Sequence, residues 1–348
     1  MKKIIKRKIE SLLIKTRIVN LFENGIPCIG HIIELHRVTS HSNILLPNTN
    51  LAISPEFLEE IIRFFIEKNY SFISLDDFYH RNWPEPKEKF VVFTFDDGYK
   101  DNFTTALPLF TKYAIPFTIY VCSGFPDQTA ILWWYIIEDI LLNNENISFY
   151  FRKNNYEFSA VTLQEKEEVF KILHKIFLLC TEDELNDLSV SFFDKYTDFH
   201  KKILEVEALS WEQITFLSDS PLVTIGCHGI NHIPITNLNA NQIKKELTGS
   251  KSRIENVINT KVEHLSFPYG KIPKDHVMIK KILNESGFKT AVVGKTGNIT
   301  GNSKFDNYNL PRISIQANES FQLLRLKTSN TIFFLEDVFN SIILRHKI

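Results

Sequence analysis

The sequence predicts a barrel-like α/β domain, and three observations favour this fold class. Apolar runs at Phe90–Phe95 and Phe117–Val121, each interrupted by a single threonine, are typical of strands that are covered on both faces of a parallel sheet. Segments with helical periodicity alternate with such runs over most of the chain. Polar clusters follow directly after three of the strands, and the carboxyl ends of the strands are where a barrel of this kind places its active site.

The composition limits the class of protein. The chain has 348 residues, of which 44% are hydrophobic and 23% charged, so it can bury a substantial core and is not disordered as a whole. Its net charge of −1 offers no electrostatic case for nucleic acid as a partner. No apolar run approaches the ~18 residues of a membrane span, which excludes a polytopic membrane protein. The cysteines form no CxxC pair and indicate neither a disulfide scaffold nor a structural zinc knuckle.

Residues 1–29 are expected to form a basic N-terminal helical segment. Residues 1–17 contain seven lysine and arginine residues against the single Glu10, and Ile5, Ile9 and Leu12 can share one helical face. Two interpretations stay open: a solvated helix packed on the body of the protein, or peripheral contact of residues 1–17 with an anionic membrane surface. Because no signal peptide is recognisable, we expect a cytoplasmic protein, at the inner face of the membrane if that contact exists.

The expected barrel domain, residues 30–325, begins with a strand over residues 31–35 that runs into His36. A helix follows from Ser54, since serine, proline and glutamate at 54–56 supply an N-cap, a favourable first turn and an acid facing the helix dipole. Residues 72–75 are expected to form a short strand. The strand Phe90–Phe95, a helix over 103–113 and the strand Phe117–Val121 then form a βα repeat.

Residues 131–210 have a different character and are expected to form a mostly helical insertion in the barrel domain. The pattern predicts a hairpin with strands at 147–151 and 156–158, a helix over 165–179, and a further helix capped by Thr181 and Glu184. The aromatic run at 133–135 is interpreted either as a platform for a sugar ring or lipid carrier or as ordinary packing against the barrel.

The alternation of strands and helices resumes after the insertion. A capped helix begins at Ser210, and a strand over 222–225, a helix over 241–257 and strands over 264–267 and 290–293 follow it. Residues 326–348 are expected to form a C-terminal helix.

The first polar cluster contains the adjacent carboxylates Asp96 and Asp97. Two carboxylates at one strand end repel each other, and the pKa of one of them rises unless a cation lies beside them. Gly98 allows the backbone to turn sharply after the pair. Taken alone, the cluster is also compatible with an ordinary Asp-Asp-Gly turn that has no catalytic role.

The second cluster contains His228 and His232, four residues apart and directly after an apolar strand. At this spacing one helical turn can present both imidazoles on the same side. Two histidines and one carboxylate form a competent catalytic metal site, and the alternative is a histidine pair without a ligand. Cys227 is expected to point to the opposite face and to pack in the core.

The third cluster, residues 266–270, again follows a strand. Pro268 and Gly270 impose an irregular turn whose backbone N–H groups can face a developing oxyanion. Together with this cluster, Thr-Phe-Asp-Asp-Gly at 94–98 and the histidine pair resemble, in order, the motifs of the polysaccharide deacetylases, the NodB-homology carbohydrate esterases. The resemblance extends from residue 30 to residue 315.

This resemblance implies a distorted (β/α) barrel of about seven parallel strands and the hydrolysis of an N- or O-acyl group, usually acetyl, on a sugar. It implies that Asp96 is the catalytic base, and it assigns Pro268 and Tyr269 to the part of the site that binds the oxyanion and substrate. It also implies one divalent metal ion, with Zn²⁺ favoured over Co²⁺, Ni²⁺ or Mn²⁺. The implied metal ligands are Asp97, His228 and His232.

The chain departs from the family pattern in three places. Gly229 stands where the second motif usually has serine or threonine, and the usual arginine upstream of the Pro-Tyr segment is not evident. No Leu-x-His motif follows the third cluster within the barrel, although residues 344–346 have that spacing. His36 resembles the acid of a subgroup with a circularly permuted barrel; the alternative is a structural histidine. Arg312 is similar to the arginine of a Pro-Arg-Ile ending and would hold Asp96 ionised, or it forms a surface salt bridge.

These residues together predict a metal-dependent deacetylase that hydrolyses an N-acetyl or O-acetyl group of a sugar. Expected substrates are a nucleotide-linked or lipid-linked acetamido sugar or a nascent surface glycan, as in the biosynthesis of cell-envelope glycans. Two alternatives stay open: a metal hydrolase of a non-sugar amide on the same barrel, and a catalytically inactive glycan-binding protein. Asp96 argues against the latter, because a binding module needs no second carboxylate beside a metal ligand and the repulsion costs stability.

Overall fold

The structure, a computed structural model of the chain, describes residues 28–40, 44–46, 48–81, 88–300, 306–317 and 319–329. The basic segment over residues 1–17 lies outside these residues, as does the expected C-terminal helix from residue 330 onward. The Leu-Arg-His sequence at 344–346 also lies outside them.

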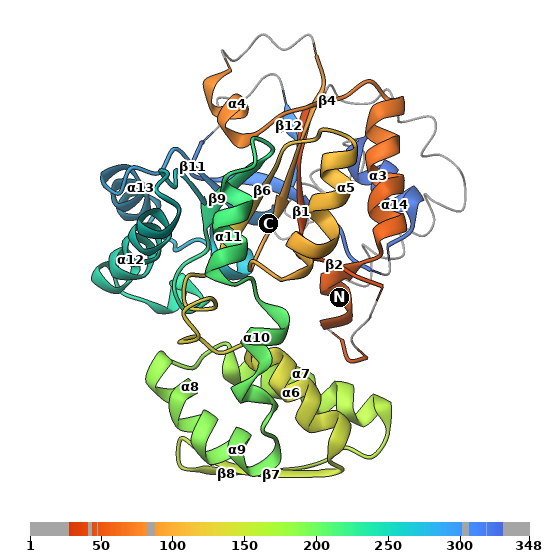
Figure 1. Cartoon of the computed structure of the whole chain (residues 1–348). Helices are drawn as coiled ribbons and strands as arrows, with labels where there is room; N and C mark the ends of the chain where they lie inside the picture. Colours follow the sequence, from red (N-terminus) through yellow and green to blue (C-terminus); the bar gives the residue numbers. More distant parts are fainter. Residues whose placement is uncertain are drawn as a thin grey trace, which may run out of the picture.

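Seven parallel strands form a closed barrel (Figure 1), which confirms the predicted fold class. In chain order they are β1 (Cys28–Leu35), β5 (Phe90–Phe95), β6 (Phe117–Val121), β9 (Val223–Cys227), β10 (His264–Ser266), β11 (Thr290–Thr296) and β13 (Leu310–Ser314). Each strand pairs with the next one in this series, and β1 pairs with both β5 and β13, so the first strand closes the ring. Two short strands extend it, β12 (Ile299–Thr300) beside β1 and β4 (Ser71–Phe72) beside β5.

Helices surround the barrel (Figure 1), and the N-caps predicted at Ser54 and Ser210 are confirmed. Within the described residues, no helix is both long and apolar enough to cross a membrane. The helices outside the insertion are α3 (Pro55–Glu67), α4 (Leu75–His80), a π-helical turn (Asn102–Ala106) that continues into α5 (Leu107–Lys112), α11 (Trp211–Ser218), α12 (Ala240–Ile258), α13 (His276–Glu285) and α14 (Phe321–Thr328).

Burial on both faces explains the continuous apolar strands. In β5, Phe90 and Val92 belong to a cluster of side chains from several barrel strands. Phe93 and Phe95 instead pack against Phe110 of α5, with ring centroids 5.2 and 5.8 Å apart. The alternate side chains of one strand therefore fill the barrel and hold a helix on its outside.

The strand predicted over residues 72–75 is wrong except at Phe72. β4 ends at Phe72, and α4 begins at Leu75. The cause is a capping box: the Ser74 hydroxyl accepts a hydrogen bond from the Asp77 backbone N–H at 3.0 Å, and the Asp77 carboxylate accepts one from the Ser74 N–H at 3.1 Å. Local capping therefore overrides the apolar pattern of this segment.

The chain between β6 and α11 forms the mostly helical part below the barrel in Figure 1. Its apolar cluster includes Tyr99, Cys122 and Phe125 from the barrel loops, so the insertion and the barrel share buried contacts. The elements are α6 (Trp133–Asn143), β7 (Asn146–Phe151), β8 (Asn154–Ser159), α7 (Leu163–Phe177), α8 (Glu182–Leu188), a π-helical turn (Ser189–Phe193), α9 (Asp194–Tyr196) and α10 (Ile203–Glu207).

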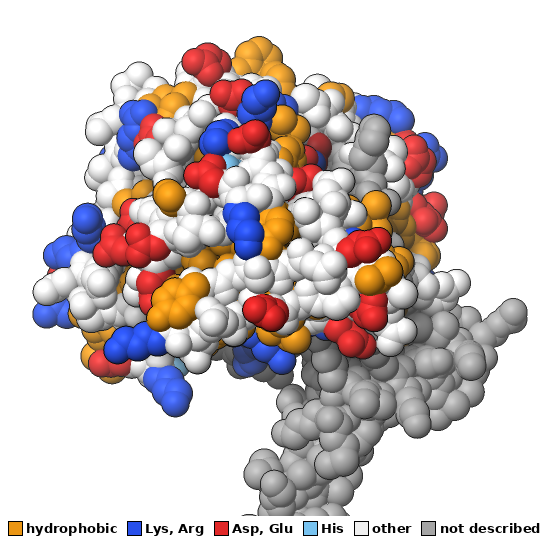
Figure 2. Space-filling view, turned by 90° about the horizontal axis from the view of Figure 1, so that it is seen from below, with side chains coloured by type: hydrophobic (Ala, Val, Ile, Leu, Met, Phe, Trp, Pro, Cys, Tyr) orange, Lys and Arg blue, Asp and Glu red, His pale blue; other side chains and the backbone are white. Residues whose placement is uncertain are grey.

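On the face seen in Figure 2, charged side chains of both signs are interspersed with hydrophobic ones, as on a solvated surface.

Glu138 of α6 ties the insertion to the loop that follows β1. Its buried carboxylate accepts hydrogen bonds from the backbone N–H groups of Ile44 and Leu45 at 2.7 and 2.9 Å. It also accepts one from Asn48 Nδ2 at 2.7 Å, and the same Nδ2 donates to the Trp134 carbonyl at 2.9 Å. The position of this loop therefore depends on one carboxylate of the insertion.

We expect Glu138→Ala to lower the free energy of unfolding by about 2–4 kcal/mol, because a buried donor left without its partner costs about 1–3 kcal/mol. Urea denaturation measures the loss, and limited proteolysis should cleave near residues 44–51 faster than in the parent. Glu157→Ala, at an exposed position of β8, is the matched control and should change neither. Equal stability of Glu138→Ala and the parent would contradict the role of this carboxylate.

Candidate metal centre and active site

The polar clusters meet at the carboxyl ends of the barrel strands, where they line one pocket of about 420 Å³. Pro268 is buried in the turn Pro268–Gly270 and is not among the lining residues of the described chain. The predicted site residues that do line the pocket are His36, Asp96, Asp97, His228, His232, Tyr269 and Arg312.

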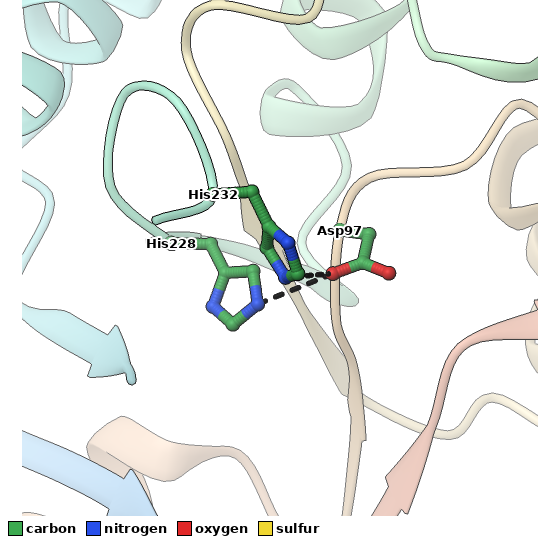
Figure 3. A group of neighbouring side chains, drawn as sticks. All are labelled: Asp97, His228 and His232. Carbon is green, nitrogen blue, oxygen red and sulfur yellow. Dashed lines mark ion pairs between the residues drawn. The ribbon is translucent and has the colours of Figure 1, made fainter. Parts of the chain in front are cut away.

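Asp97, His228 and His232 converge on one point (Figure 3). The Nε2 atoms of His228 and His232 lie 3.2 and 3.1 Å from Asp97 Oδ1, and all three side chains are buried. His228 Nδ1 lies 2.8 Å from the Ser266 carbonyl, which only accepts, so Nδ1 carries the proton and Nε2 offers its lone pair. Atoms that share a zinc ion at about 2.0–2.1 Å in tetrahedral geometry lie roughly 3.3 Å apart, so this spacing fits a divalent cation.

The electrostatics of this triad also fit a cation. Burial alone would raise the pKa of Asp97, but His232 and His228 outweigh it and hold the pKa well below its usual range. Asp97 Oδ1 is nevertheless buried without a hydrogen-bond partner among the described residues, and so is His232 Nδ1. Buried polar atoms of this kind are rare without a ligand.

The prediction that a helical turn presents the two histidines is wrong. They lie on an irregular loop after β9, in which His232 has a φ of 53°. Asp97 and Tyr269 also adopt left-handed backbone conformations, with φ of 72° and 58°. Left-handed conformations cost energy for residues other than glycine and cluster at functional sites. Three irregular turns, one from each cluster, therefore aim the side chains into the pocket.

The loop with the histidines is held by α12. Glu246 Oε1 accepts hydrogen bonds from the backbone N–H groups of Ile230 and Asn231 at 2.8 and 2.7 Å, and Ser250 Oγ donates to the Gly229 carbonyl at 2.7 Å. Gly229 has a φ of 81°, and a Cβ there would lie 3.0 Å from Glu246 Oε1. A serine or threonine at residue 229 would have a hydroxyl that could support the loop. Here residue 229 is glycine, and the Glu246 carboxylate supports the loop instead.

Asp96 lines the same pocket as the three candidate metal ligands, and its carboxylate pairs with Arg312. The guanidinium donates to both carboxylate oxygens, at 2.7 and 2.6 Å, and Ser266 Oγ donates to Asp96 Oδ2 at 3.1 Å. The pair is buried and so is not a surface salt bridge. Burial would raise the pKa of Asp96, but the charge and hydrogen bonds of Arg312 hold it below its usual range.

His36 lies beside Asp96 at the end of β1. His36, Glu34 and Asp96 each offer one side-chain atom that could bind a metal, and these three atoms lie within 4.8 Å of one another. The His36 backbone carbonyl accepts a hydrogen bond from Asn102 Nδ2 at 2.9 Å. This second group is not a metal centre, because the Arg312 guanidinium already occupies both oxygens of Asp96 and lies 3.3 Å from Glu34. His36 therefore lines the pocket beside Asp96 without belonging to a second metal centre.

Sequence reasoning missed Glu34, Glu246 and His174. Glu34 lies two residues before His36, so the alternation of strand side chains could have placed it on the same side. Glu246 and His174 lie on helices far from the motifs in sequence, and only the fold brings them to the site.

Comparison with known protein families identifies one match. The profile of the family described as Polysaccharide deacetylase matches residues 84–291, more than half of the chain. No curated protein matches the sequence.

Several solved structures share the fold. The deacetylase PplD of Streptococcus pyogenes, in complex with acetate, has a TM-score of 0.56 at 17% identity, over 86% of this chain and 97% of its own. IcaB from Ammonifex degensii has a TM-score of 0.54 at 14% identity, over 87% of this chain and 97% of its own. A polysaccharide deacetylase from Bacillus cereus has a TM-score of 0.53 at 14% identity, over 86% and 68%. At these identities the likeness establishes the fold.

We expect Glu246→Ala to weaken Zn²⁺ binding by about 10–100-fold, because residues that orient metal ligands typically contribute that much. Calorimetric titration of the chelator-treated protein with Zn²⁺ measures the change, and His228→Ala should abolish binding. Glu246→Gln keeps one oxygen that can accept both hydrogen bonds and should lose less. Lys245→Ala, at an exposed neighbouring position of α12, is the control. Parental affinity in Glu246→Ala would exclude this positioning role.

Proposed function

The chain belongs to the polysaccharide deacetylase family, and from this membership we propose that it removes an N-acetyl, or O-acetyl, group from a sugar with the help of a divalent metal ion. Members of this family are hydrolases that act on the C–N bonds of acetylated sugars.

The observation that carries the proposal is the separation of the two adjacent aspartates. Asp97 faces His228 and His232, whereas Asp96 is held by Arg312. One carboxylate is thereby suited to bind a cation and the other to exchange a proton, although the two are neighbours in the chain. A site that only binds a ligand has no use for a second carboxylate beside the metal ligand. Since burying that carboxylate costs free energy, its presence favours a catalytic role.

The roles follow from this arrangement. Asp97, His228 and His232 would hold the ion, which when bound supplies a Lewis acid that polarises the acyl oxygen and acidifies a nearby water molecule. Asp96, kept ionised by Arg312, takes a proton from the attacking water as the water oxygen bonds to the acyl carbon.

Two further groups complete the reaction. His36 donates a proton to the leaving nitrogen as the C–N bond breaks, so the products are acetate and a free amino sugar. The backbone N–H of Tyr269 is suited to stabilise negative charge on the acyl oxygen. The Tyr269 ring lies 4.4 Å from that of His232, which keeps this turn against the metal ligands.

We expect Asp96→Asn to lower the rate of acetate release by about 10²–10⁴-fold, since this is the usual contribution of a general acid or base. Asparagine has nearly the same shape but cannot take the proton, so the protein should still bind Zn²⁺. His36→Ala should lose activity to a similar extent. The measurement is acetate release from acetylated chitooligosaccharides and lipid-linked acetamido sugars.

Glu157→Ala again serves as the control for this experiment. Full activity of His36→Ala would refute the assignment of the acid, and full activity of Asp96→Asn would refute the mechanism. Simple amides, tested beside the sugars, distinguish a deacetylase from a hydrolase of non-sugar amides. A parent protein that binds glycans but releases no acetate would be a binding protein.

We further propose that the substrate is met in the cytoplasm, as a nucleotide-linked or lipid-linked acetamido sugar or a nascent glycan, at the inner face of the membrane. The support is the basic composition of residues 1–17. Each basic residue near an anionic surface contributes roughly 1 kcal/mol of attraction.

The membrane contact is tested by flotation with liposomes. We expect the full chain to float with vesicles that contain anionic phosphatidylserine and not with neutral phosphatidylcholine vesicles. A chain without residues 1–17 should stay at the bottom of the gradient with both. Equal flotation of the two chains would exclude the contact.

A further inference from the structure

The insertion forms one wall of the pocket. In the barrel ring, β6 lies opposite β11 and β13, and the insertion follows β6. Trp134 of α6 and His174 of α7 line the pocket from the insertion, while Thr296 of β11 and Ser314 of β13 line it from the barrel. A ligand at the metal centre is therefore enclosed between the insertion and the opposite strand ends.

Hydrogen bonds and ring contacts fix Trp134 on the side of the pocket that the insertion forms. Trp134 Nε1 donates a hydrogen bond to the Tyr99 hydroxyl at 3.2 Å, and its ring lies 5.1 Å from that of His232. The Trp134 carbonyl accepts a hydrogen bond from Asn48, which is buried and tied to Glu138. Because these contacts are internal to the fold, a chain of sugars has no passage between the metal ligands and α6.

His174 offers hydrogen bonds at this wall. Its ring lies 5.2 Å from that of Trp133, and neither ring nitrogen has a hydrogen-bond partner among the described residues. Burial and the nearby Lys271 lower the pKa of His174, so the ring is neutral at neutral pH and has one donor and one acceptor. A sugar hydroxyl, which both donates and accepts, is complementary to such a ring.

The opposite side of the pocket is also polar. The side chains of Thr296, Ser314 and Gln316 line it, and none of them has a hydrogen-bond partner within the part of the chain that the structure describes. These groups suit the hydroxyls of further sugars. A glycan can therefore leave the metal centre on the side of β11 and β13, and not on the side of the insertion.

We propose that the insertion closes one end of the binding site and that His174 binds a hydroxyl of the sugar at the end of a glycan chain. Acetyl groups are then removed from a terminal sugar, or from a single sugar on a carrier, and not from sugars in the interior of a polysaccharide. This inference rests on the proposed deacetylase function and adds the position of the reacting sugar.

The test uses the full-length, Zn²⁺-loaded protein and the tetrasaccharide of N-acetylglucosamine, with ¹⁸O at the reducing end. Mass-spectrometric sequencing of the products locates each free amino group. We expect it at one terminal sugar only. Free amino groups at interior sugars would overturn the inference and leave the deacetylase function standing, whereas no acetate release from any acetylated sugar would overturn both.

Variants test the part played by His174. We expect His174→Ala to raise KM for the tetrasaccharide about 5–10-fold with little change in kcat, since one hydrogen bond contributes about 1 kcal/mol. His174→Gln can still donate and accept, so its KM should stay closer to the parental value. Lys175→Ala, at an exposed position of the same helix, should leave KM unchanged. An unchanged KM in His174→Ala, with an unfolding temperature equal to that of the parent, would refute the contact.

Discussion

The rest of the site depends on the buried ion pair between Arg312 and Asp96. It joins β13 to the end of β5 across β1, whose Glu34 lies 3.3 Å from the same guanidinium. Neither partner is stable there alone, because removing one partner of a buried pair costs about 3–5 kcal/mol. With Asp96 turned toward Arg312, Asp97 is left to face the histidines. One contact thus links closure of the barrel to the different surroundings of two neighbouring carboxylates.

Much of this arrangement could be predicted from the sequence, for a physical reason. In a parallel barrel all strands run the same way, so residues that follow apolar runs meet at one end, whatever their distance in the chain. The clusters around Asp96, His228 and Tyr269 could therefore be assigned to one site from the sequence, and they line one pocket. The burial of β5 on both faces was likewise evident from its apolar run, which only Thr94 interrupts.

The remaining features depend on contacts that leave no local pattern. The loop with His232 is irregular because Glu246 and Ser250, on the following helix, bind its backbone, and nothing in the spacing of the histidines indicates this. His174 resembles any other histidine of an amphipathic helix until the insertion is placed over the barrel. At residues 72–75 two kinds of local signal conflict, and hydrogen bonds at Ser74 decide the outcome. A sequence pattern indicates the periodicity of a helix or strand and the residues that cap a helix. It does not indicate which distant helix supports a loop.

Because β1 pairs with both β5 and β13, a chain that is still being synthesised cannot complete the barrel until its last strand has left the ribosome. Asp96 and Arg312 are 216 residues apart, so the carboxylate lacks its counter-charge for most of that time. Closure through such distant contacts makes folding slow and leaves strand edges unpaired in the meantime. A chain interrupted before residue 310 would therefore lack the ring and the counter-charge together, and would expose an open edge of the kind that leads to aggregation.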